Sequence, residues 1–287
     1  MRDETAAGAV TEELRPLMLS IAYRMVGSLT EAEDLVQEAF LRLHEAGEVD
    51  NPKAWLTTVV TRLAIDHLRS ARVRREEYPG NWLPEPVLAD PAPAAAARAE
   101  SLSLAVLVLL ESLTPVERAV FVLREAFDYG YDEIAAIVGK TEANCRQLAA
   151  RARRHVELRR PRFAPSREQR DRLVRRFVAA LQEGETEPLF ELLAADAEFY
   201  GDGGGQAPAV GRPVRGAEAV VRLLAGFIRA GARRNAAAEV LEFNGESGFA
   251  GYEDGRLVAV WAFEVSGDGI RAIRGIVNPD KLRHLER

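Results

Sequence analysis

Residues 131–154 read YDEIAAIVGKTEANCRQLAARARR, and this stretch decides the fold of the middle of the chain. The apolar run IAAIV gives one face of a short helix, which Gly139 ends because glycine adopts the left-handed conformation without strain. Thr141 can cap a second helix that runs from Glu142 to about Val156. Two short helices joined by a tight, glycine-containing turn are typical of a helix-turn-helix. An ordinary helical hairpin with a solvated basic face is the alternative.

The second helix of this pattern carries side chains that can read base edges and contact phosphates. They are Arg146, Gln147, Arg151, Arg153 and Arg154. Cys145, which is the only cysteine, lies within the same helix and is interpreted as a small core or interface residue. A single cysteine excludes a disulfide framework and fits a reducing cytosol.

Net charge is −6, which is unexpected for a protein that binds DNA, but the charge is segregated along the chain. Residues 140–162 hold eight Lys or Arg against two acids, and residues 62–75 hold five Arg against one acid. Residues 31–50 hold seven acids against one Arg. Two basic blocks favour nucleic acid, and the acidic block favours a protein partner. The sequence also predicts no transmembrane helix and no signal peptide.

Residues 10–75 show helical spacing throughout. Gly27-Ser28 interrupts the first helix, and Thr30 is expected to begin a capping box for the second helix. The second helix has a buried stripe opposite an acidic, exposed face. The third helix is expected to run from Lys53 to about Arg72, to bury Trp55, Val59 and Leu63, and to expose Thr57, Thr58, Thr61, Arg62, Asp66 and Arg69.

Two motif groups resemble the extracytoplasmic-function (ECF) sigma factors, which are bacterial specificity subunits of RNA polymerase. AEDLVQEAF (32–40), AWL (54–56) and AIDHLR (64–69) look like region 2 of that family. Leu113-Thr114-Pro115 with Arg118, followed by the helix-turn-helix, looks like region 4. Both occur in the family's order, and this raises the helix-turn-helix interpretation above the hairpin alternative.

The resemblance implies three binding surfaces. The first surface binds RNA polymerase core, whose expected contacts are the largest-subunit clamp helices and the flap. Its residues are Glu33, Asp34, Gln37, Glu38 and Arg42. The second captures the −10 promoter element through Thr58, Thr61, Arg62, Asp66 and Arg69. The third reads the −35 element through Lys140, Thr141, Asn144, Arg146, Gln147, Arg151, Arg153 and Arg154.

Residues 76–100 contain five prolines, which exclude a continuous helix and indicate a linker. Trp82-Leu83-Pro84-Glu85-Pro86 is unusually apolar for a solvated linker. Residues 82–86 have two interpretations that the sequence does not separate. They are a local hydrophobic anchor or a docking peptide that is held in a groove.

From about residue 166 the sequence pattern changes from all-helical to mixed helix and strand. Ser166 to Gln169 can cap a helix that ends near Glu183, a short helix is expected at Leu189–Leu193, and residues 216–230 form another helix. Residues 236–277 read as antiparallel strands separated by Gly-containing turns. Helices followed by an antiparallel sheet indicate an α+β domain.

This α+β part resembles the cone-shaped SnoaL/NTF2-like fold, and three segments resemble signatures of the ECF group with a fused SnoaL-like C-terminal domain. These signatures imply interdomain regulatory residues, namely Trp82, Leu83, Pro84, Glu85, Pro86, Asp202, Gly203, Gly204, Gly205, Asn278, Pro279, Asp280 and Lys281. Gln206 departs from the pattern, which tends to have Lys after the glycines. The glycine loop suits close backbone approach, and a plain surface loop is the alternative.

The expected organisation is multidomain: two all-α sigma domains and one α+β domain. The segments are 10–75 (region 2), 76–101 (linker), 102–158 (region 4), 159–168 (linker) and 169–285 (SnoaL-like domain).

The expected function is a cytoplasmic alternative sigma factor regulated in cis by its last domain, with RNA polymerase core and promoter DNA as partners and no membrane partner. No cofactor, metal or enzymatic activity is expected, although Glu198, Tyr200 and Asp202 share a strand face and a small-molecule ligand of unknown identity stays open. The alternatives are a ligand-responsive helix-turn-helix regulator and a SnoaL-type enzyme with a DNA-binding appendage.

Overall fold

The computed structural model describes residues 2–88, 103–159, 165–232, 234–267 and 269–285. The chain divides into two compact units. The first unit contains the described residues of 1–76 and 106–159, and the second contains those of 77–89, 103–105 and 160–287. Segment 77–88, which lies within the expected linker 76–101, therefore packs with the C-terminal domain.

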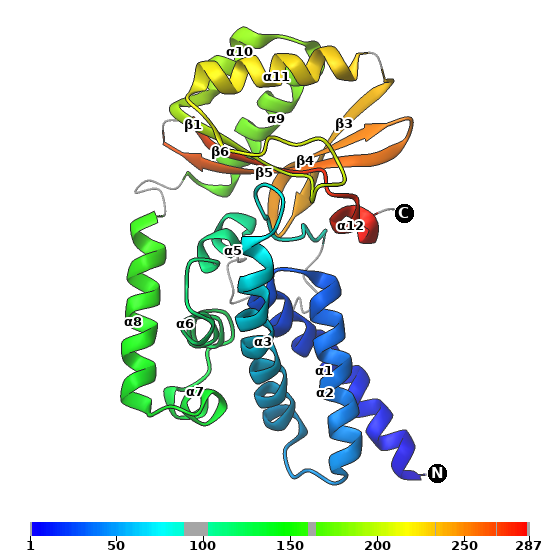
Figure 1. Cartoon of the computed structure of the whole chain (residues 1–287), viewed down its shortest axis with the longest axis vertical. Helices are drawn as coiled ribbons and strands as arrows, with labels where there is room; N and C mark the ends of the chain where they lie inside the picture. Colours follow the sequence, from blue (N-terminus) through cyan, green and yellow to red (C-terminus); the bar gives the residue numbers. More distant parts are fainter. Residues whose placement is uncertain (1, 89–102, 160–164, 233, 268, 286–287) are drawn as a thin grey trace. The chain divides into compact units, whose positions relative to one another are not determined.

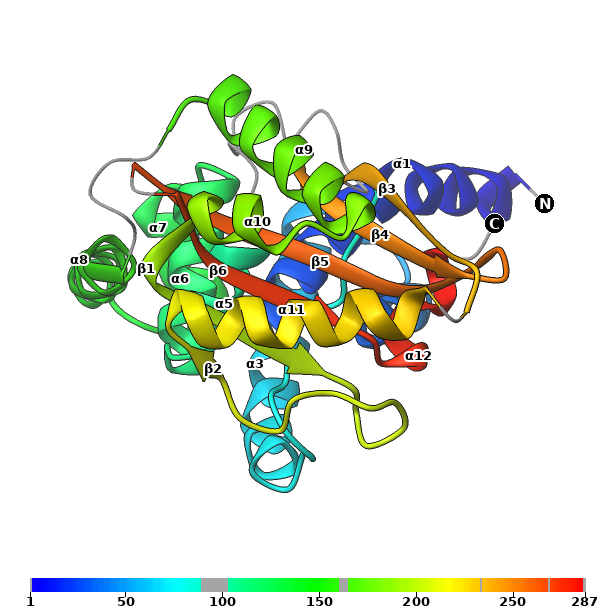
Figure 2. The ribbon, with the colours of Figure 1, turned by 90° about the horizontal axis from the view of Figure 1, so that it is seen from above.

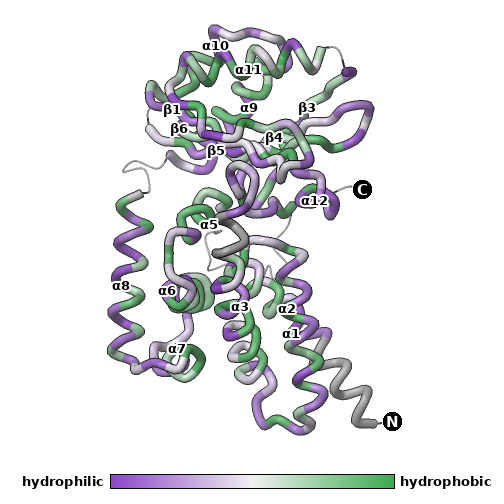
Figure 3. The backbone as a smooth tube through the Cα atoms, in the orientation of Figure 1, coloured by the Kyte–Doolittle hydropathy of each residue, from purple (hydrophilic) through white to green (hydrophobic). Residues whose placement is uncertain are grey.

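Three helices form the N-terminal part of the first unit and pack on one another, and hydrophobic and hydrophilic stretches alternate along them (Figures 1 and 3). They are α1 (Arg2–Val26), α2 (Leu29–Ala46) and α3 (Pro52–Glu76). The expected capping box at Thr30 is wrong: Ser28 is the N-cap of α2, and its hydroxyl accepts from the Glu31 amide at 3.2 Å. The helix begins earlier because Ser28 follows directly on Gly27, whose positive φ ends α1.

The buried register of α3 also differs from expectation. Trp55, Val59 and Leu63 are only half-buried, whereas Leu56 and Val60 are completely buried. Helix α3 contacts α1 and α2, but it also contacts α6 and α7, so more than one of its faces is covered. A single apolar stripe in the sequence could not indicate that second contact.

Four helices and a π-helical turn follow in the described residues 103–159, and the first of these helices begins in residues that group with the second unit. They are α5 (Leu104–Leu110), α6 (Pro115–Phe121), the π-helical turn (Val122–Ala126), α7 (Tyr131–Val138) and α8 (Glu142–Arg159). Thr114 and Glu117 form the capping box of α6. Gly139 ends α7 in the left-handed conformation, with φ of 65°, and the Thr141 hydroxyl accepts from the Asn144 amide at 3.3 Å. The helix-turn-helix and its two boundary signals are therefore confirmed. Cys145 is completely buried, as expected of a core residue.

The second unit is an α+β domain built on a six-stranded sheet in the order β2-β1-β6-β5-β4-β3. Strands β1 and β6 pair in parallel, and the other neighbours are antiparallel. The strands are β1 (Leu193–Asp202), β2 (Val214–Arg215), β3 (Ala236–Phe243), β4 (Glu246–Glu253), β5 (Arg256–Ser266) and β6 (Gly269–Ile276).

Helices α9 (Arg167–Glu183), α10 (Thr186–Leu192) and α11 (Ala217–Gly231) lie over one face of this sheet (Figure 2). The capping box of α9, formed by Ser166 and Gln169, is confirmed. Helix α10 ends before Leu193, which begins β1 instead of closing the helix. A short helix, α12 (Pro279–Leu282), follows the last strand.

Aromatic side chains fill the space between the helices and the sheet. Phe249 stacks on Trp261 with ring centroids 4.5 Å apart, and Phe199 meets Trp261 edge-on at 5.5 Å. Phe177 of α9 meets Phe263 of β5 at 5.3 Å and is completely buried. These rings belong to the hydrophobic core of the second unit, which is closely packed in the described residues.

We expect Phe177→Ala to destabilise the second unit by about 3–5 kcal/mol, because it removes a fully buried ring and leaves a cavity. Hydrogen exchange at β5 and β6 amides in the full chain measures the effect. Phe190→Ala is the matched control, since Phe190 is 52% exposed, and it should change protection little. Equal effects of the two variants would contradict this description of the core.

Candidate functional site

The predicted −35 side chains all lie on an exposed surface of the helix-turn-helix. Three of the arginines already have acidic partners: Arg146 pairs with Glu142, Arg151 with Glu117 at 3.3 Å, and Arg153 with Glu125 at 2.6 Å. The hydrogen bond that Arg153 donates to Glu125 is the main cause that raises the pKa of Arg153. The Thr141 hydroxyl caps α8, so this residue has a structural role whatever it contacts in DNA.

The predicted −10 residues on α3 do not form one exposed surface. Thr61 is completely buried, and its hydroxyl has no hydrogen-bond partner among the described residues. The expected exposure of Thr61, and likewise that of Thr57, is therefore wrong, because both side chains are completely buried. Thr58 bonds to the Ala54 carbonyl at 2.9 Å, and Asp66 pairs with Arg69 at 2.8 Å. Arg62 donates instead to two carbonyls of α7.

The acidic face of α2 is exposed. Glu33, Asp34 and Gln37 lie in solvent, and Glu38 pairs with Arg42 at 2.8 Å with both side chains about half exposed. Val36 and Ala39 on the other side are completely buried. The helix therefore presents a negatively charged surface that is available to a basic partner.

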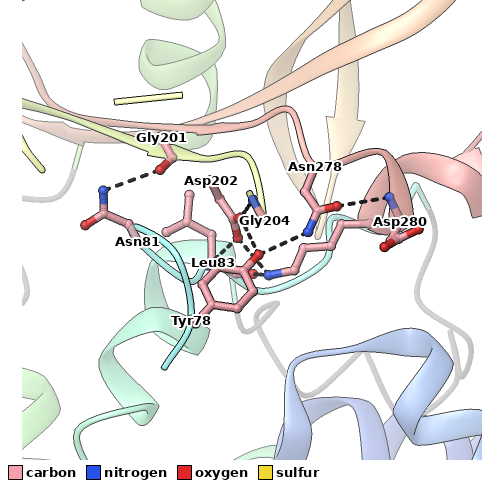
Figure 4. Close-up of polar contacts among 9 residues, drawn as sticks. Tyr78, Asn81, Leu83, Gly201, Asp202, Gly204, Asn278 and Asp280 are labelled. Carbon is pink, nitrogen blue, oxygen red and sulfur yellow. Dashed lines mark hydrogen bonds and ion pairs between the residues drawn. The ribbon is translucent and has the colours of Figure 1, made fainter. Parts of the chain in front are cut away.

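A second cluster, the Asp202 clasp, holds segment 77–88 on the C-terminal domain (Figure 4). We define it as Tyr78, Leu83, Asp202, Asn278 and Lys281. The completely buried Asp202 carboxylate accepts four hydrogen bonds: from the Tyr78 hydroxyl at 2.6 Å, the Gly204 amide at 3.1 Å, the Leu83 amide at 2.8 Å and Lys281 Nζ at 2.7 Å. A buried carboxylate needs such a full set of donors.

Lys281 provides the compensating charge and is itself about 94% buried, with a relative exposure of 6%. Its ammonium group also donates to the Leu83 carbonyl and lies 4.3 Å from the centroid of the Trp82 ring and 5.2 Å from that of Tyr78. A cation over an aromatic face is stabilised by the ring quadrupole, more so when desolvated. Burial, followed by the hydrogen bond to Asp202, raises the pKa of Tyr78, so its hydroxyl stays a donor.

The glycine loop allows this close approach. Gly204 has a φ of +59°, and a Cβ there would lie 2.2 Å from the Asn278 side-chain nitrogen. A Cβ at Gly203 would lie 2.1 Å from the Ala207 carbonyl oxygen. Asn278 Nδ2 donates to the Tyr78 hydroxyl at 3.0 Å, while its Oδ1 accepts from the Asp280 amide and caps α12. The three signature segments thus meet within one unit.

Further contacts extend along the segment, and the sequence analysis missed their residues. The Asn244 side chain accepts from the Val87 amide at 3.2 Å, and the Asn244 amide donates back to the Val87 carbonyl at 2.8 Å. His284 Nε2 donates to the Pro86 carbonyl at 2.7 Å. Asn81 donates to the Gly201 and Val210 carbonyls. The available signal was the Asn244-Gly245 turn, where both residues have positive φ.

Not every predicted regulatory residue joins the clasp. Pro84, Glu85 and Pro86 are buried along the segment, whereas Pro279 is exposed. Asp280 pairs with Arg283 at 2.9 Å, and its carboxylate also accepts a hydrogen bond from the side-chain amide of Gln206. Gln206, which departs from the expected pattern, therefore connects the glycine loop to Asp280 by a hydrogen bond.

The strand residues considered for catalysis are occupied by other contacts. Glu198 accepts from Tyr200 and pairs with Arg215 at 2.7 Å, and the hydrogen bond from Tyr200 is the main cause that lowers the pKa of Glu198. Burial, with the hydrogen bond to Glu198 second, raises the pKa of Tyr200 to about 12. Asp202 is saturated by its four donors. Each of the three side chains therefore already has a polar partner within the domain.

Two family descriptions match this chain: Sigma-70 region 2 over residues 10–74, and Sigma-70 region 4 over residues 103–156. These cover the two helical parts of the first unit and include the exposed faces of α2 and α8. Among the described residues, no helix is long and apolar enough to cross a membrane.

Relatives extend the similarity to the whole chain. The ECF RNA polymerase sigma factor SigJ of Mycobacterium tuberculosis is 40% identical over 94% of this chain and 91% of its own. The crystal structure of that sigma factor matches with a TM-score of 0.77 and 37% identity, covering 96% of this chain and 98% of that one. The probable sigma factor SigI of the same organism is 38% identical over 62% of this chain and 64% of its own. The chain belongs to the ECF RNA polymerase sigma factor family and has the fused α+β domain.

We expect Asp202→Asn to release segment 77–88, because it leaves the buried Lys281 without its counter-charge, at a cost of about 3–5 kcal/mol. Hydrogen exchange at amides 78–88 in the full chain measures the release. Asp196→Asn removes an exposed pair with Arg271 in the same domain and should cost less than about 1 kcal/mol. Unchanged protection in Asp202→Asn would show that the clasp does not hold the segment.

Proposed function

We propose that this chain binds bacterial RNA polymerase core in the cytoplasm and directs transcription from its own set of promoters. Region 2 docks on the clamp helices of the largest subunit through the acidic face of α2 and takes up the −10 element. Region 4 reads the −35 element through α8 and contacts the flap. Membership of the ECF family supports this function, and the exposure of both faces is consistent with it.

We further propose that the C-terminal domain regulates initiation in cis, without an enzymatic role. The observation that carries this proposal is the clasp around Asp202. The chain between the end of α3 and the start of α5 is the tether that joins region 2 to region 4. When residues 78–87 are fixed on the C-terminal domain, the tether contains fewer free residues. The range of distances that region 2 and region 4 can adopt is then narrower. Release of the clasp restores that reach.

A ligand-responsive repressor is the second function we considered. Such a protein binds duplex DNA unaided and has no need for an acidic helix in a separate region. The matched region 2, with its exposed acidic face on α2, favours a polymerase subunit. Transcription from a cognate promoter by purified core plus this chain, compared with core alone, tests the choice directly.

Reversing Asp34 and Glu38 to Lys should abolish core binding, because both carboxylates lie on the solvent side of α2 and would face a basic partner. Affinity for core, measured by fluorescence anisotropy, reports the loss, and circular dichroism should show an unchanged fold. The double variant Glu12→Lys/Glu13→Lys, at two exposed positions of α1, is the charge-matched control. If core affinity survives the double reversal, α2 is not the docking face.

Substitutions along α8 should separate into two classes. Arg146→Ala or Gln147→Ala, near the helix start, should relax sequence choice at a cost of about 1–3 kcal/mol if either side chain makes a good base contact. Arg153→Ala or Arg154→Ala should weaken binding to all sequences and reduce its salt dependence. Binding of holoenzyme to promoter variants at several salt concentrations tests this. Identical specificity changes in all four variants would refute the assignment.

Trp82→Ala should loosen the clasp, because the ring covers the Lys281 ammonium group, and should raise transcription from a cognate promoter. Limited proteolysis between residues 76 and 89 and multi-round transcription are the two measurements. Tyr252→Phe, a change on β4 outside the clasp, is the control. Faster proteolysis with unaltered transcription would retain the clasp but reject its regulatory role.

A further inference from the structure

Region 2 and region 4 contact one another directly within the first unit. Arg62 of α3 donates from Nε to the Ile137 carbonyl at 2.9 Å and from Nη2 to the Ala136 carbonyl at 3.1 Å. Both carbonyls belong to the last turn of α7, the first helix of the helix-turn-helix. A cation is favoured there because the final carbonyls of a helix lack partners and carry the negative end of its dipole.

A second polar contact lies about one turn away on α3. The Thr57 hydroxyl meets the Tyr129 hydroxyl at 3.0 Å, and Tyr129 lies just before α7. Burial raises the pKa of Tyr129, so its hydroxyl remains protonated and available for this bond. A third contact joins Arg118 Nε to the Arg24 carbonyl at 3.3 Å.

Groups assigned to different promoter elements consequently line one groove. Its volume is about 350 Å³, and its walls carry Arg62, Asp66 and Arg69 from α3 with Val138, Gly139 and Lys140 from the turn of the helix-turn-helix. The two elements that these residues are expected to bind are well separated on promoter DNA. The first unit therefore has its promoter-binding groups in an arrangement that they cannot keep when both elements are bound.

We infer that Arg62 is a latch residue with two competing partners: the α7 carbonyls in the closed first unit, and the DNA backbone at the −10 element in the open one. This inference rests on the proposed function and adds a closing contact that is separate from the Asp202 clasp. A guanidinium cannot use the same N–H groups for the carbonyls and for a phosphate. Engagement of the −10 element and opening of the two regions are therefore coupled.

The contact between regions 2 and 4 is suited to reversible opening because a buried polar group there has no hydrogen-bond partner among the described residues. Arg118 is about 99% buried, and its Nη2 has no partner among the described residues. Water satisfies such groups when the surfaces separate, so hydration offsets part of what opening removes.

Pulsed electron-paramagnetic-resonance distances in the full chain test the latch. Labels on Ser70→Cys in α3 and Ala150→Cys in α8 report the separation, since both positions are exposed while the native Cys145 is buried. Without DNA, the parent protein should give a narrow, short distribution. Arg62→Ala should raise the open-to-closed ratio about tenfold, the effect of losing hydrogen bonds from a charged donor.

Four further variants separate the latch from DNA binding, and those at Ala136 and Tyr129 leave the predicted promoter contacts intact. Ala136→Arg places a second cation beside Arg62 and should open the unit, whereas Ala136→Glu adds an attractive charge and should close it further. Tyr129→Phe removes one hydroxyl without changing charge; it should open the unit modestly and strengthen binding to a −10 single strand. Arg62→Lys keeps the charge for phosphate but lacks the planar fork, so it should open the unit while retaining most DNA affinity.

The outcomes distinguish the latch from the proposed function. Opposite shifts for Ala136→Arg and Ala136→Glu, with unchanged circular dichroism, would establish the latch. A broad, long distribution in the parent, or distances unmoved by all five variants, would overturn it. Failure of the parent to bind core or to transcribe would reject the proposed function, and label distances that still respond would leave the latch standing.

Discussion

The second unit depends on a buried charge pair, Asp202 with Lys281. Neither charge is stable in such a site unless nearly every lone pair and N–H group finds a partner. The partners come from the end of β1, the glycine loop, α12 and segment 77–88, so all four must be placed together. A pair of this kind adds little net stability compared with an apolar contact, but its geometric demands specify one arrangement. That requirement explains why a proline-rich segment that lacks helix and strand is nevertheless held along its length.

The distribution of apolar and polar contacts indicates which parts of the chain are built to separate. Inside the α+β domain, Phe177, Phe199 and Trp261 form a close-packed core whose loss would be costly. Between α3 and α7, hydrogen bonds to backbone carbonyls and a hydroxyl pair are prominent, and water can replace them. The polar character of that contact is consistent with a sigma factor that changes shape when it meets its partners. The clasp lies between these extremes, because it is polar but buried.

Local signals in the sequence predicted the elements they govern. Ser166 and Gln169 locate the start of α9, and Gly139 with Thr141 locates the turn of the helix-turn-helix, because each acts on backbone groups only a few residues away. Partners distant in sequence were not predictable in this way. Tyr78 and Asn244 belong to no sequence motif that we recognised. Their roles depend on hydrogen-bond partners more than 100 residues away in the chain. The resemblance to known signatures located Asp202 and Lys281, yet only the structure shows that one carboxylate joins the three segments. Thr61 was misplaced because α3 is covered on more than one side.

Most of the arginines that we assign to promoter DNA already make other contacts, which changes how their contribution to DNA binding should be understood. Arg62 has two carbonyls, and Arg151 and Arg153 have carboxylates. Each phosphate contact is therefore an exchange of one acceptor for another, and the net gain is smaller than for a fully hydrated guanidinium. The carboxylates of Glu117 and Glu125 also remain close by after the exchange and oppose the approaching phosphates. Under the proposed assignment, we expect DNA binding by such a surface to be weak by itself and to depend on a partner that holds the DNA in place. An alternative sigma factor has that need, because polymerase core supplies the rest of the promoter contacts, and a weak intrinsic affinity keeps the unbound subunit from occupying promoters alone.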